Sequence, residues 1–417
     1  MGCILTKVCA TDDDDDSLLV DDLKQQQSLA ARALGMPKRI TRTATTMMLL
    51  DPLMPTKSNS TPDTIPHPQR GPVVADGVYY GGGIPGVALD EFALSSPEYT
   101  GAVDGGYTST SGRLRWGAHT RAGNDPLQRR KENQDSFCVA DRLADESNVT
   151  FFSVFDGHGP HGAYVSHYVR EVYHEKLAST YKDLVLQSKA ESSSRRSSVG
   201  HDIMGELFQR AAQSVSDSLK TAATESPTID ISVSGTTAVA MLVCDRDVFV
   251  ANIGDSRAVV AVYSEAENKY VIRHETKDHK PELPDERQRI EANNGRVFEW
   301  GSFRVWLQDV DMPGLAMSRS LGDSVAHTVG VTCEPDVTYV DRIVHSNTEH
   351  PSFAVLASDG VWEFMSTDEC VAFVADCVSI KHMGPQEACN ALVAEACDRW
   401  NKEEDVVDDI TALVVLF

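Results

Sequence analysis

The chain has 417 residues, 41% of them hydrophobic, which is enough for one large or two medium domains with a substantial core. Its formal net charge of −24 excludes the usual electrostatic basis for nucleic-acid binding and fits a soluble protein whose carboxylates collect divalent cations. No apolar run is long enough to span a bilayer, and the nine cysteines form no C-x-x-C motif, which indicates a reducing compartment.

The first residues, MGCILT, carry a pattern for lipid attachment. Gly2 followed by Thr6 fits the N-myristoylation pattern, and Cys3 is a candidate for palmitoylation. Two lipids are needed because a single myristoyl chain binds membranes only marginally. The alternative is an ordinary exposed N-terminus in a cytoplasmic protein. We expect residues 1–10 to tether the protein to the cytoplasmic face of a membrane through lipid, since Asp12–Asp16 opposes docking by charge.

The next segment, residues 11–112, has the composition of an unfolded chain. It is acidic and proline-rich, and it is also rich in Gln, Thr, Ser and Gly. Such a segment buries too little apolar surface to offset the entropy lost on ordering. We therefore expect a disordered tail that serves as a tether.

From residue 113 to 417 the hydrophobic pattern predicts a folded domain, interrupted by a polar insertion at about 180–202. Alternating or continuous apolar runs predict strands at Arg113–Ala118, Asp135–Ala140, Val149–Phe155, Thr236–Cys244, Asp247–Ile253, Ala258–Tyr263, Phe353–Ser358 and Ile410–Phe417. Helical spacing and caps predict helices at His161–Ser179, Ile203–Ala223, Asp285–Asn294 ending at Gly295, Ser366–Val378 and Gln386–Trp400. Consecutive strands with helices in blocks favour an α+β fold with antiparallel sheets.

Acidic residues stand at the ends of the apolar strands. The clearest case is the run FFSVF, which is followed directly by Asp156-Gly157-His158-Gly159. The set comprises Asp135, Asp156, Asp255, Asp359, Asp408 and Asp409. One such acid is usually a turn former or a helix cap, but the repetition favours a metal site. Oxygen ligands without a Cys or His cluster favour Mg²⁺ or Mn²⁺ over zinc.

A site with two such cations is suited to phosphoryl transfer, since the metals clamp an in-line displacement. It also needs an arginine for the phosphate oxygens and an acid for the leaving group. Arg130 lies shortly before Asp135, and His158 lies just after Asp156, so both types of group are at hand. The chain has no H-E-x-x-H motif, P-loop or G-x-S-x-G motif.

Several motifs occur in the order of a known family: RKENQDSF, FFSVFDGHGPHG, SGTTAV, ANIGDSRAV, KDHKP, GLAMSRSLGD, EPDV, FAVLASDGVWEFMS and DDITALVV. Together they resemble the metal-dependent Ser/Thr phosphatases of the PPM family (type 2C) from about Gly112 to Phe417. The resemblance implies an αββα sandwich of two antiparallel β-sheets flanked by helices, a variable flap at about 280–314, phosphorylated proteins as substrates, and Mg²⁺ or Mn²⁺ as cofactors. We expect a monomer.

The resemblance also implies a set of metal ligands. Asp156 would bridge two metals, and the carbonyl of Gly157 would complete the first site. Asp359 and Asp408 would hold the second metal. Asp255 matches a position that, together with Asp359, forms a third and weaker metal site in some members.

Three further roles follow from the resemblance. Asp135 would orient the attacking water. Arg130 would bind the substrate phosphate, with Arg129 as the alternative if the register slips by one. His158 would protonate the departing Ser or Thr oxygen.

The chain departs from the family pattern at two places. Gln134 stands where many members have Glu, and Glu363 stands where some have a third-site Asp. The alternative function is a catalytically weak or dead relative that acts as a scaffold or regulator, although such a protein is expected to have lost metal ligands. Separately, the sequence RRSS at Arg195–Ser198 fits a kinase site with Ser198 as acceptor, or simply a solvated loop.

Overall fold

The computed structural model describes residues 74–75, 78–82, 105–109, 112–186, 201–342 and 349–417. The proposed lipid-bearing residues Gly2 and Cys3, most of the range 1–112, and Ser198 lie outside these described residues. None of the described helices is both long and apolar enough to cross a membrane.

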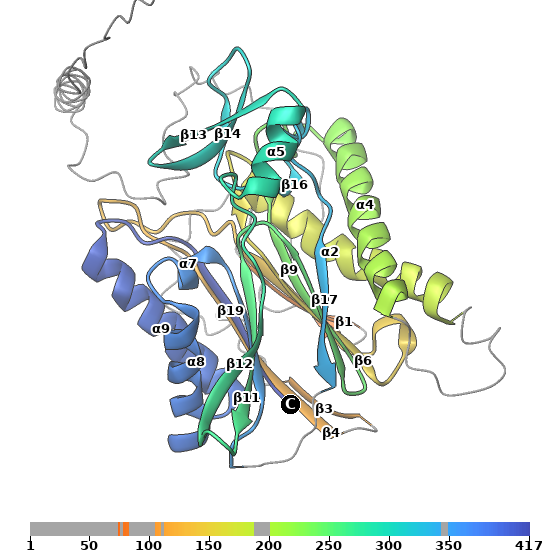
Figure 1. The fold of residues 1–417 in the computed structure, drawn as a ribbon, viewed down its shortest axis with the longest axis vertical. Coiled ribbons are helices and arrows are strands. Elements are labelled where there is room, and N and C mark those ends of the chain that lie inside the picture. Colours follow the sequence, from red (N-terminus) through yellow and green to blue (C-terminus); the bar gives the residue numbers. More distant parts are fainter. Residues whose placement is uncertain (1–73, 76–77, 83–104, 110–111, 187–200, 343–348) are drawn as a thin grey trace, which may run out of the picture. The chain divides into compact units, whose positions relative to one another are not determined.

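Two large sheets, antiparallel throughout, form the centre of the domain (Figure 1). The seven-stranded sheet contains, in spatial order, β1 (Val74–Ala75), β2 (Val78–Gly82), β5 (Ser136–Ala140), β6 (Val149–Phe155), β9 (Ala238–Cys244), β10 (Asp247–Ile253) and β17 (Asp336–Arg342). The six-stranded sheet contains β12 (Lys269–Glu275), β11 (Arg257–Ser264), β18 (Phe353–Ala357), β19 (Ile410–Leu416), β4 (Gly112–Arg121) and β3 (Gly105–Ser109).

Helices cover the outer face of each large sheet (Figure 1). The seven-stranded sheet packs against α2 (Gly162–Tyr181) and α4 (His201–Glu225), and the six-stranded sheet against α8 (Thr367–Ala375) and α9 (Pro385–Glu403). The short α7 (Asp359–Trp362) packs against α9 and β19.

Alternation of side chains along the central strands produces three apolar layers. In β6, Phe151 and Phe155 face α2 and α4, whereas Phe152 and Val154 face the other sheet. In β19, Leu413 and Val415 join that same inter-sheet layer, and the residues between them pack under α8 and α9. Successive residues of a strand point to opposite faces, so a strand buried on both sides is apolar throughout. The αββα sandwich implied by the family resemblance is confirmed.

Two small three-stranded sheets lie at the end of the sandwich that carries the acids. One consists of β13 (Gly295–Trp300), β14 (Ser302–Leu307) and β15 (Pro313–Leu315), next to α5 (Pro284–Ala292), and it occupies the range expected for the flap. The other joins β16 (Leu321–Gly322), β8 (Gly235–Thr236) and β7 (Gly157–His158), followed by the short α6 (Ser324–His327). This second small sheet holds the Asp-Gly-His segment.

Strands β1, β2 and β3 lie within 11–112, so the expected disordered tail does not hold for their residues. They are short strands at the edge of a sheet or next to it: β2 lies between β1 and β5, and β3 pairs with β4. Strands of so few residues carry little sequence signal. Likewise α2 ends at Tyr181 and continues as a helical turn to Leu186, so the polar insertion begins later than expected. Gly295 is not the cap of α5 but the first residue of β13.

Candidate metal-binding active site

The fold brings the strand-end acids to one end of the two sheets. Asp135 directly precedes β5 and Asp156 directly follows β6, and these strands pair so that Ser136 lies opposite Phe155. In the other sheet β18 pairs with β19, and Asp359 follows β18 while Asp408 and Asp409 precede β19. Antiparallel pairing therefore places the end of one strand beside the start of its neighbour. The sixth acid, Asp255, lies in the turn between β10 and β11.

The charges of these acids act on one another. Burial, followed by the charges of Asp359, Asp135, Asp408 and Asp255, raises the pKa of Asp156 well above its usual value. Burial and neighbouring carboxylates likewise raise the pKa of Asp359 well above its usual value. Burial and then Asp409 raise the pKa of Asp135 to about 8. Such shifts arise where like charges share a poorly hydrated site.

Solvent reaches only part of the cluster. Asp135, Asp255 and Asp409 are buried, whereas Asp156, Asp359 and Asp408 are partly exposed. The partly exposed three are those that the family resemblance assigns as side-chain ligands of two metals. They are the acids that an ion entering from solvent reaches first.

Two lysines neutralise part of the charge. Lys131 Nζ donates to Asp408 Oδ1 over 2.7 Å and lies 4.0 Å from Asp409 Oδ1. Lys280 Nζ donates to Asp255 Oδ2 over 2.6 Å. Although burial opposes it, these carboxylates raise the pKa of both ammonium groups. Sequence reasoning missed both lysines.

The donor set fits divalent cations that prefer oxygen ligands. Six carboxylates face two lysines, and the buried Asp255 Oδ1 has no hydrogen-bond partner within the part of the chain that the structure describes. Among the described residues, no three His, Cys, Asp or Glu side chains lie close enough together to hold a metal ion as they stand. The arrangement is thus an acid cluster with surplus negative charge, which Mg²⁺ or Mn²⁺ would compensate.

Hydrogen bonds fix the orientation of two of the buried acids, Asp135 and Asp409. Ser358 Oγ donates to Asp135 Oδ2 over 2.7 Å. Asp409 accepts from the backbone N–H groups of Gly123 (2.7 Å) and Gln134 (2.9 Å). Asp409 thereby ties the segment before β5 to the start of β19. This tie is a structural role that the sequence did not reveal.

The backbone around Gly157 leaves no room for a side chain. A Cβ there would lie 2.4 Å from the carbonyl oxygen of Gln134 and 2.5 Å from that of Gly162. The Asp156 N–H donates to Thr237 Oγ1 over 3.0 Å, which fixes the turn at the end of β6. The glycine therefore allows the close backbone packing on which the Asp-Gly-His segment depends.

The structure separates the two candidate arginines. Arg129 pairs with Asp125 over 2.6 Å, and its side chain is 67% exposed. Arg130 is half-buried, and its Nη1 donates to the carbonyl of Ala122, next to the Gly123 N–H that binds Asp409. This position next to the acid cluster favours Arg130 over Arg129.

His158 is buried and paired with an acid far along the chain. Its Nε2 lies 2.7 Å from Asp323 Oδ2. Although burial alone would lower it, the charge of Asp323 raises the pKa of His158 above its usual value. Asp323 lies in the SRSLGD motif, to which sequence reasoning gave no individual role.

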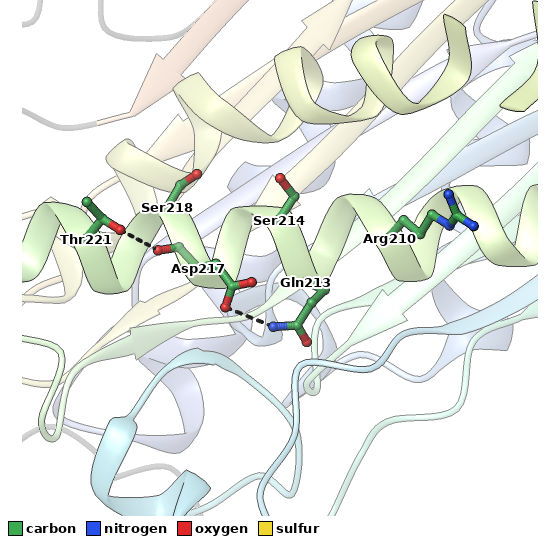
Figure 2. A pocket seen from close by; sticks show the side chains of 6 residues that line it. All are labelled: Arg210, Gln213, Ser214, Asp217, Ser218 and Thr221. Atoms are coloured by element: carbon green, nitrogen blue, oxygen red, sulfur yellow. Dashed lines mark hydrogen bonds between the residues drawn. The ribbon is translucent and has the colours of Figure 1, made fainter. Parts of the chain in front are cut away.

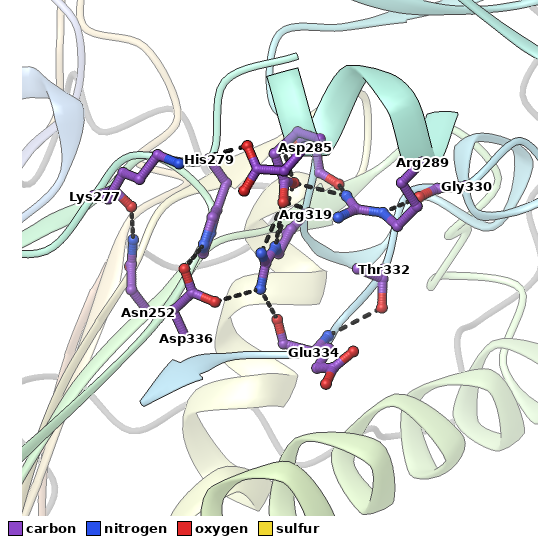
Figure 3. Close-up of polar contacts among 12 residues, drawn as sticks. Asn252, Lys277, His279, Asp285, Arg289, Arg319, Gly330, Thr332, Glu334 and Asp336 are labelled. Carbon is purple, nitrogen blue, oxygen red and sulfur yellow. Dashed lines mark hydrogen bonds and ion pairs between the residues drawn. The ribbon is translucent and has the colours of Figure 1, made fainter. Parts of the chain in front are cut away.

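A polar network joins α5, the SRSLGD segment and β17 (Figure 3). Arg319 pairs with buried Glu286 and with Asp336, each at less than 3 Å, and Arg289 also pairs with Glu286. The buried His279 lies 3.1 Å from Asp336 and accepts from the Gly254 N–H. This network supports the segment that ends in Asp323.

Away from this site, a polar pocket of about 440 Å³ lies along α4 (Figure 2). Its lining residues are Arg210, Gln213, Ser214, Asp217, Ser218 and Thr221. None of the six clustered acids lines it, so it is not part of the candidate site.

Comparison with known sequences decides the family. The sequence model described as Protein phosphatase 2C matches residues 123–405, more than half of the chain. The chain belongs to the protein phosphatase 2C family. "Probable protein phosphatase 2C 35" of Arabidopsis thaliana is 34% identical over 307 residues, covering 68% of this chain and 78% of that protein. "Probable protein phosphatase 2C 64" of Oryza sativa subsp. japonica is 34% identical over 324 residues, covering 76% of this chain and 69% of that protein.

Solved structures share the fold. The serine-threonine phosphatase 2C from Toxoplasma gondii superposes with a TM-score of 0.61 at 22% identity, covering 76% of this chain and 99% of that one. A C. elegans sex-determining protein superposes with a TM-score of 0.52 at 18% identity, covering 73% of this chain and 64% of that one. The chain is thus a protein phosphatase 2C family member, and enzymes of this family generally depend on divalent metals.

Proposed function

We propose that the protein is an active phosphatase that hydrolyses phosphoserine and phosphothreonine on proteins and requires two Mg²⁺ or Mn²⁺ ions. The observation that carries this proposal is the cluster of six carboxylates, whose mutual repulsion and burial raise the pKa values of Asp135, Asp156 and Asp359. Maintaining such a cluster costs stability unless cations compensate it. Family membership supplies the matching reaction class.

We assign the metal ligands as Asp156, the carbonyl of Gly157, Asp359 and Asp408, with Asp255 available to a third ion. Bound divalent cations would supply charge for the phosphoryl oxygens and lower the pKa of water. The oxygen-only donor set and the solvent exposure of Asp156, Asp359 and Asp408 support this assignment.

The remaining roles belong to the chain's own groups. Arg130 binds the phosphate oxygens, since a guanidinium matches their geometry with two parallel N–H donors. Asp135, held by Ser358, accepts a hydrogen bond from the attacking water and orients it. His158 gives a proton to the departing Ser or Thr oxygen, which is a poor leaving group without one.

The test is hydrolysis of a phosphoserine peptide by the purified full chain, with EDTA and then with added Mn²⁺ or Mg²⁺. We expect activity to vanish with EDTA and to return with the metal. Asp359→Asn should remove it, whereas the matched control Asp398→Asn should not, because Asp398 is exposed on α9, away from the cluster. A wild-type protein inactive on every phosphopeptide at saturating Mn²⁺ would instead support the scaffold alternative.

We also propose that the protein is a monomer held at the cytoplasmic face of a membrane by acylation of Gly2 and Cys3. The MGCILT pattern supports the acylation. Gly2→Ala should move the protein from the membrane to the soluble fraction of cells. Cys3→Ser should release only part of the protein from the membrane. Unchanged membrane association of Gly2→Ala would overturn the lipid anchor without affecting the phosphatase proposal.

A further inference from the structure

The histidine assigned as the acid is held by a buried carboxylate. His158 Nε2 lies 2.7 Å from Asp323 Oδ2, and the two residues are 165 positions apart in the sequence. Asp323 is only 1% exposed, and Ser320 Oγ donates to the same Oδ2 over 2.6 Å. Because a carboxylate only accepts hydrogen bonds, the ring nitrogen that contacts it carries a hydrogen. The contact therefore determines which tautomer of neutral His158 is present.

The backbone around this pair is shaped to allow it. In the small sheet, His158 lies opposite Gly235, and Gly235 in turn lies opposite Gly322. A Cβ on Gly235 would lie 2.1 Å from Asp323 Oδ2 and 2.8 Å from His158 Nε2. Any residue other than glycine at position 235 would thus occupy the place where the two side chains meet.

Asp323 is itself held in an uncommon conformation. Its φ of 45° is left-handed, a conformation that non-glycine residues adopt rarely and at a cost in free energy. The Asp323 N–H donates to the carbonyl of Ser234 over 2.9 Å, and the adjacent Arg319 network braces the segment. Such conformations persist where the surroundings fully determine them, and they are common at functional sites.

The second ring nitrogen of His158 is not used by the described part of the chain. Nδ1 is buried and has no hydrogen-bond partner among the described residues. Leaving a buried polar atom unpaired costs folding free energy. A substrate oxygen that bonds to Nδ1 would relieve that cost, so the pair is incomplete until a ligand arrives.

We propose that Asp323 is a positioning residue that holds His158 through Nε2, so that Nδ1 delivers the proton to the departing Ser or Thr oxygen. This inference rests on the proposed phosphatase function. As water forms the new P–O bond, the bond from phosphorus to the Ser or Thr oxygen breaks and its electron pair stays on that oxygen. For this step His158 starts with a hydrogen on each ring nitrogen. The proton on Nδ1 moves to the departing oxygen, the protons of the attacking water leave with the phosphate, and the now neutral His158 keeps its hydrogen on Nε2, facing Asp323. A proton from solvent then restores Nδ1–H.

The test uses Asp323→Asn, whose side-chain amide has nearly the same shape but, when its NH₂ faces the ring, stabilises the opposite tautomer. We expect kcat for a phosphoserine peptide to fall about 10–100-fold, since a well-placed general acid contributes about 10²–10⁴-fold. The kcat for p-nitrophenyl phosphate, whose leaving group needs little protonation, should fall less than about threefold. In a His158→Ala background, Asp323→Asn should cause no further loss on the peptide.

Equal losses on both substrates, or a further loss in the His158→Ala background, would show that Asp323 acts only on the fold. If Asp323→Asn is too unstable to purify, Ser320→Ala replaces it, because it removes one support of the carboxylate and keeps the charge. It should give a smaller loss with the same substrate selectivity, and an unselective loss would overturn the inference. Full peptide activity of Asp323→Asn beside an active wild type would refute only this inference, whereas an inactive wild type would refute the phosphatase function.

Discussion

If the acid cluster exists to bind cations, neutralising one of its members should have opposite effects on stability without and with metal. Asp156→Asn removes a carboxylate that is opposed by the charges of Asp359, Asp135, Asp408 and Asp255. Without metal, the variant should be more stable than the wild type, because this repulsion is relieved. With metal, it should be less stable, because the proposed bridging ligand is lost.

The sign of the first effect and the size of the second can both be stated. Burial and the neighbouring carboxylates raise the pKa of Asp156 well above its usual value, so its charged form destabilises the folded chain and the variant should melt above the wild type in EDTA. A change of 1 kcal/mol moves the unfolding midpoint by about 2–4 °C in domains of 150–250 residues. Cation at 100 times its dissociation constant stabilises the wild type by about 2.7 kcal/mol, or about 5–11 °C.

The assay is thermal unfolding at pH 8, followed by circular dichroism in EDTA and then across an Mn²⁺ series. Asp398→Asn is the matched control, since it removes one exposed carboxylate elsewhere and should follow the wild type under both conditions. The curves of Asp156→Asn and wild type should cross as Mn²⁺ rises. The reasoning would be refuted if Asp156→Asn melted below the wild type already in EDTA, or if Mn²⁺ raised its melting midpoint as much as that of the wild type.

Three further predictions concern the groups around the cluster. Arg130→Ala should raise KM for a phosphopeptide at least 10-fold in steady-state assays, and an unchanged KM would remove Arg130 from the phosphate site. Lys280→Met removes the ammonium group that pairs with buried Asp255. The variant should have a lower melting midpoint in EDTA, and Mn²⁺ should raise that midpoint more than it does in the wild type. An equal rise in both proteins would show that the lysine and the metal do not compete. Burial would raise the pKa of Glu286, but hydrogen bonds from Arg289, Arg319 and Ser318 hold it well below its usual value. The stability that ionised Glu286 contributes is therefore present above about pH 4.5 and is lost as the pH falls through its folded-state pKa. Glu286→Gln should lower the free energy of unfolding in urea at pH 7, and its difference from wild type should narrow in acid; a difference that does not change with pH would contradict this.

The central strands were predictable because both of their faces are buried. Val149–Phe155 and Asp247–Ile253 were predicted with their observed bounds, since continuous apolar runs between turns have few alternatives. The edge strands β12 and β17 were missed. In β12 most side chains are exposed or half-buried, so its sequence lacks the apolar signal, and its existence depends on pairing with β11.

The acids of the site were visible for a local reason, because each one interrupts an apolar strand at its end. Their partners carried no such signal. Lys131 and Asp408 are 277 positions apart, and His158 and Asp323 are 165 apart, so only the folded chain brings them together. A lysine or aspartate in a loop has many ordinary uses on a protein surface, and its type alone does not reveal a buried partner.

This difference bears on how the site works. The strand-end acids define which ligands a cation would meet, but Lys131 and Lys280 set how much negative charge remains for it. A cation that binds at Asp408 or Asp255 must displace an ammonium group or share the carboxylate with it, and each displaced ion pair lowers the net gain. The affinity of the centre for metal should therefore depend on residues that are not ligands, which is why the variant Lys280→Met tests the acid cluster as directly as a change in one of its acids.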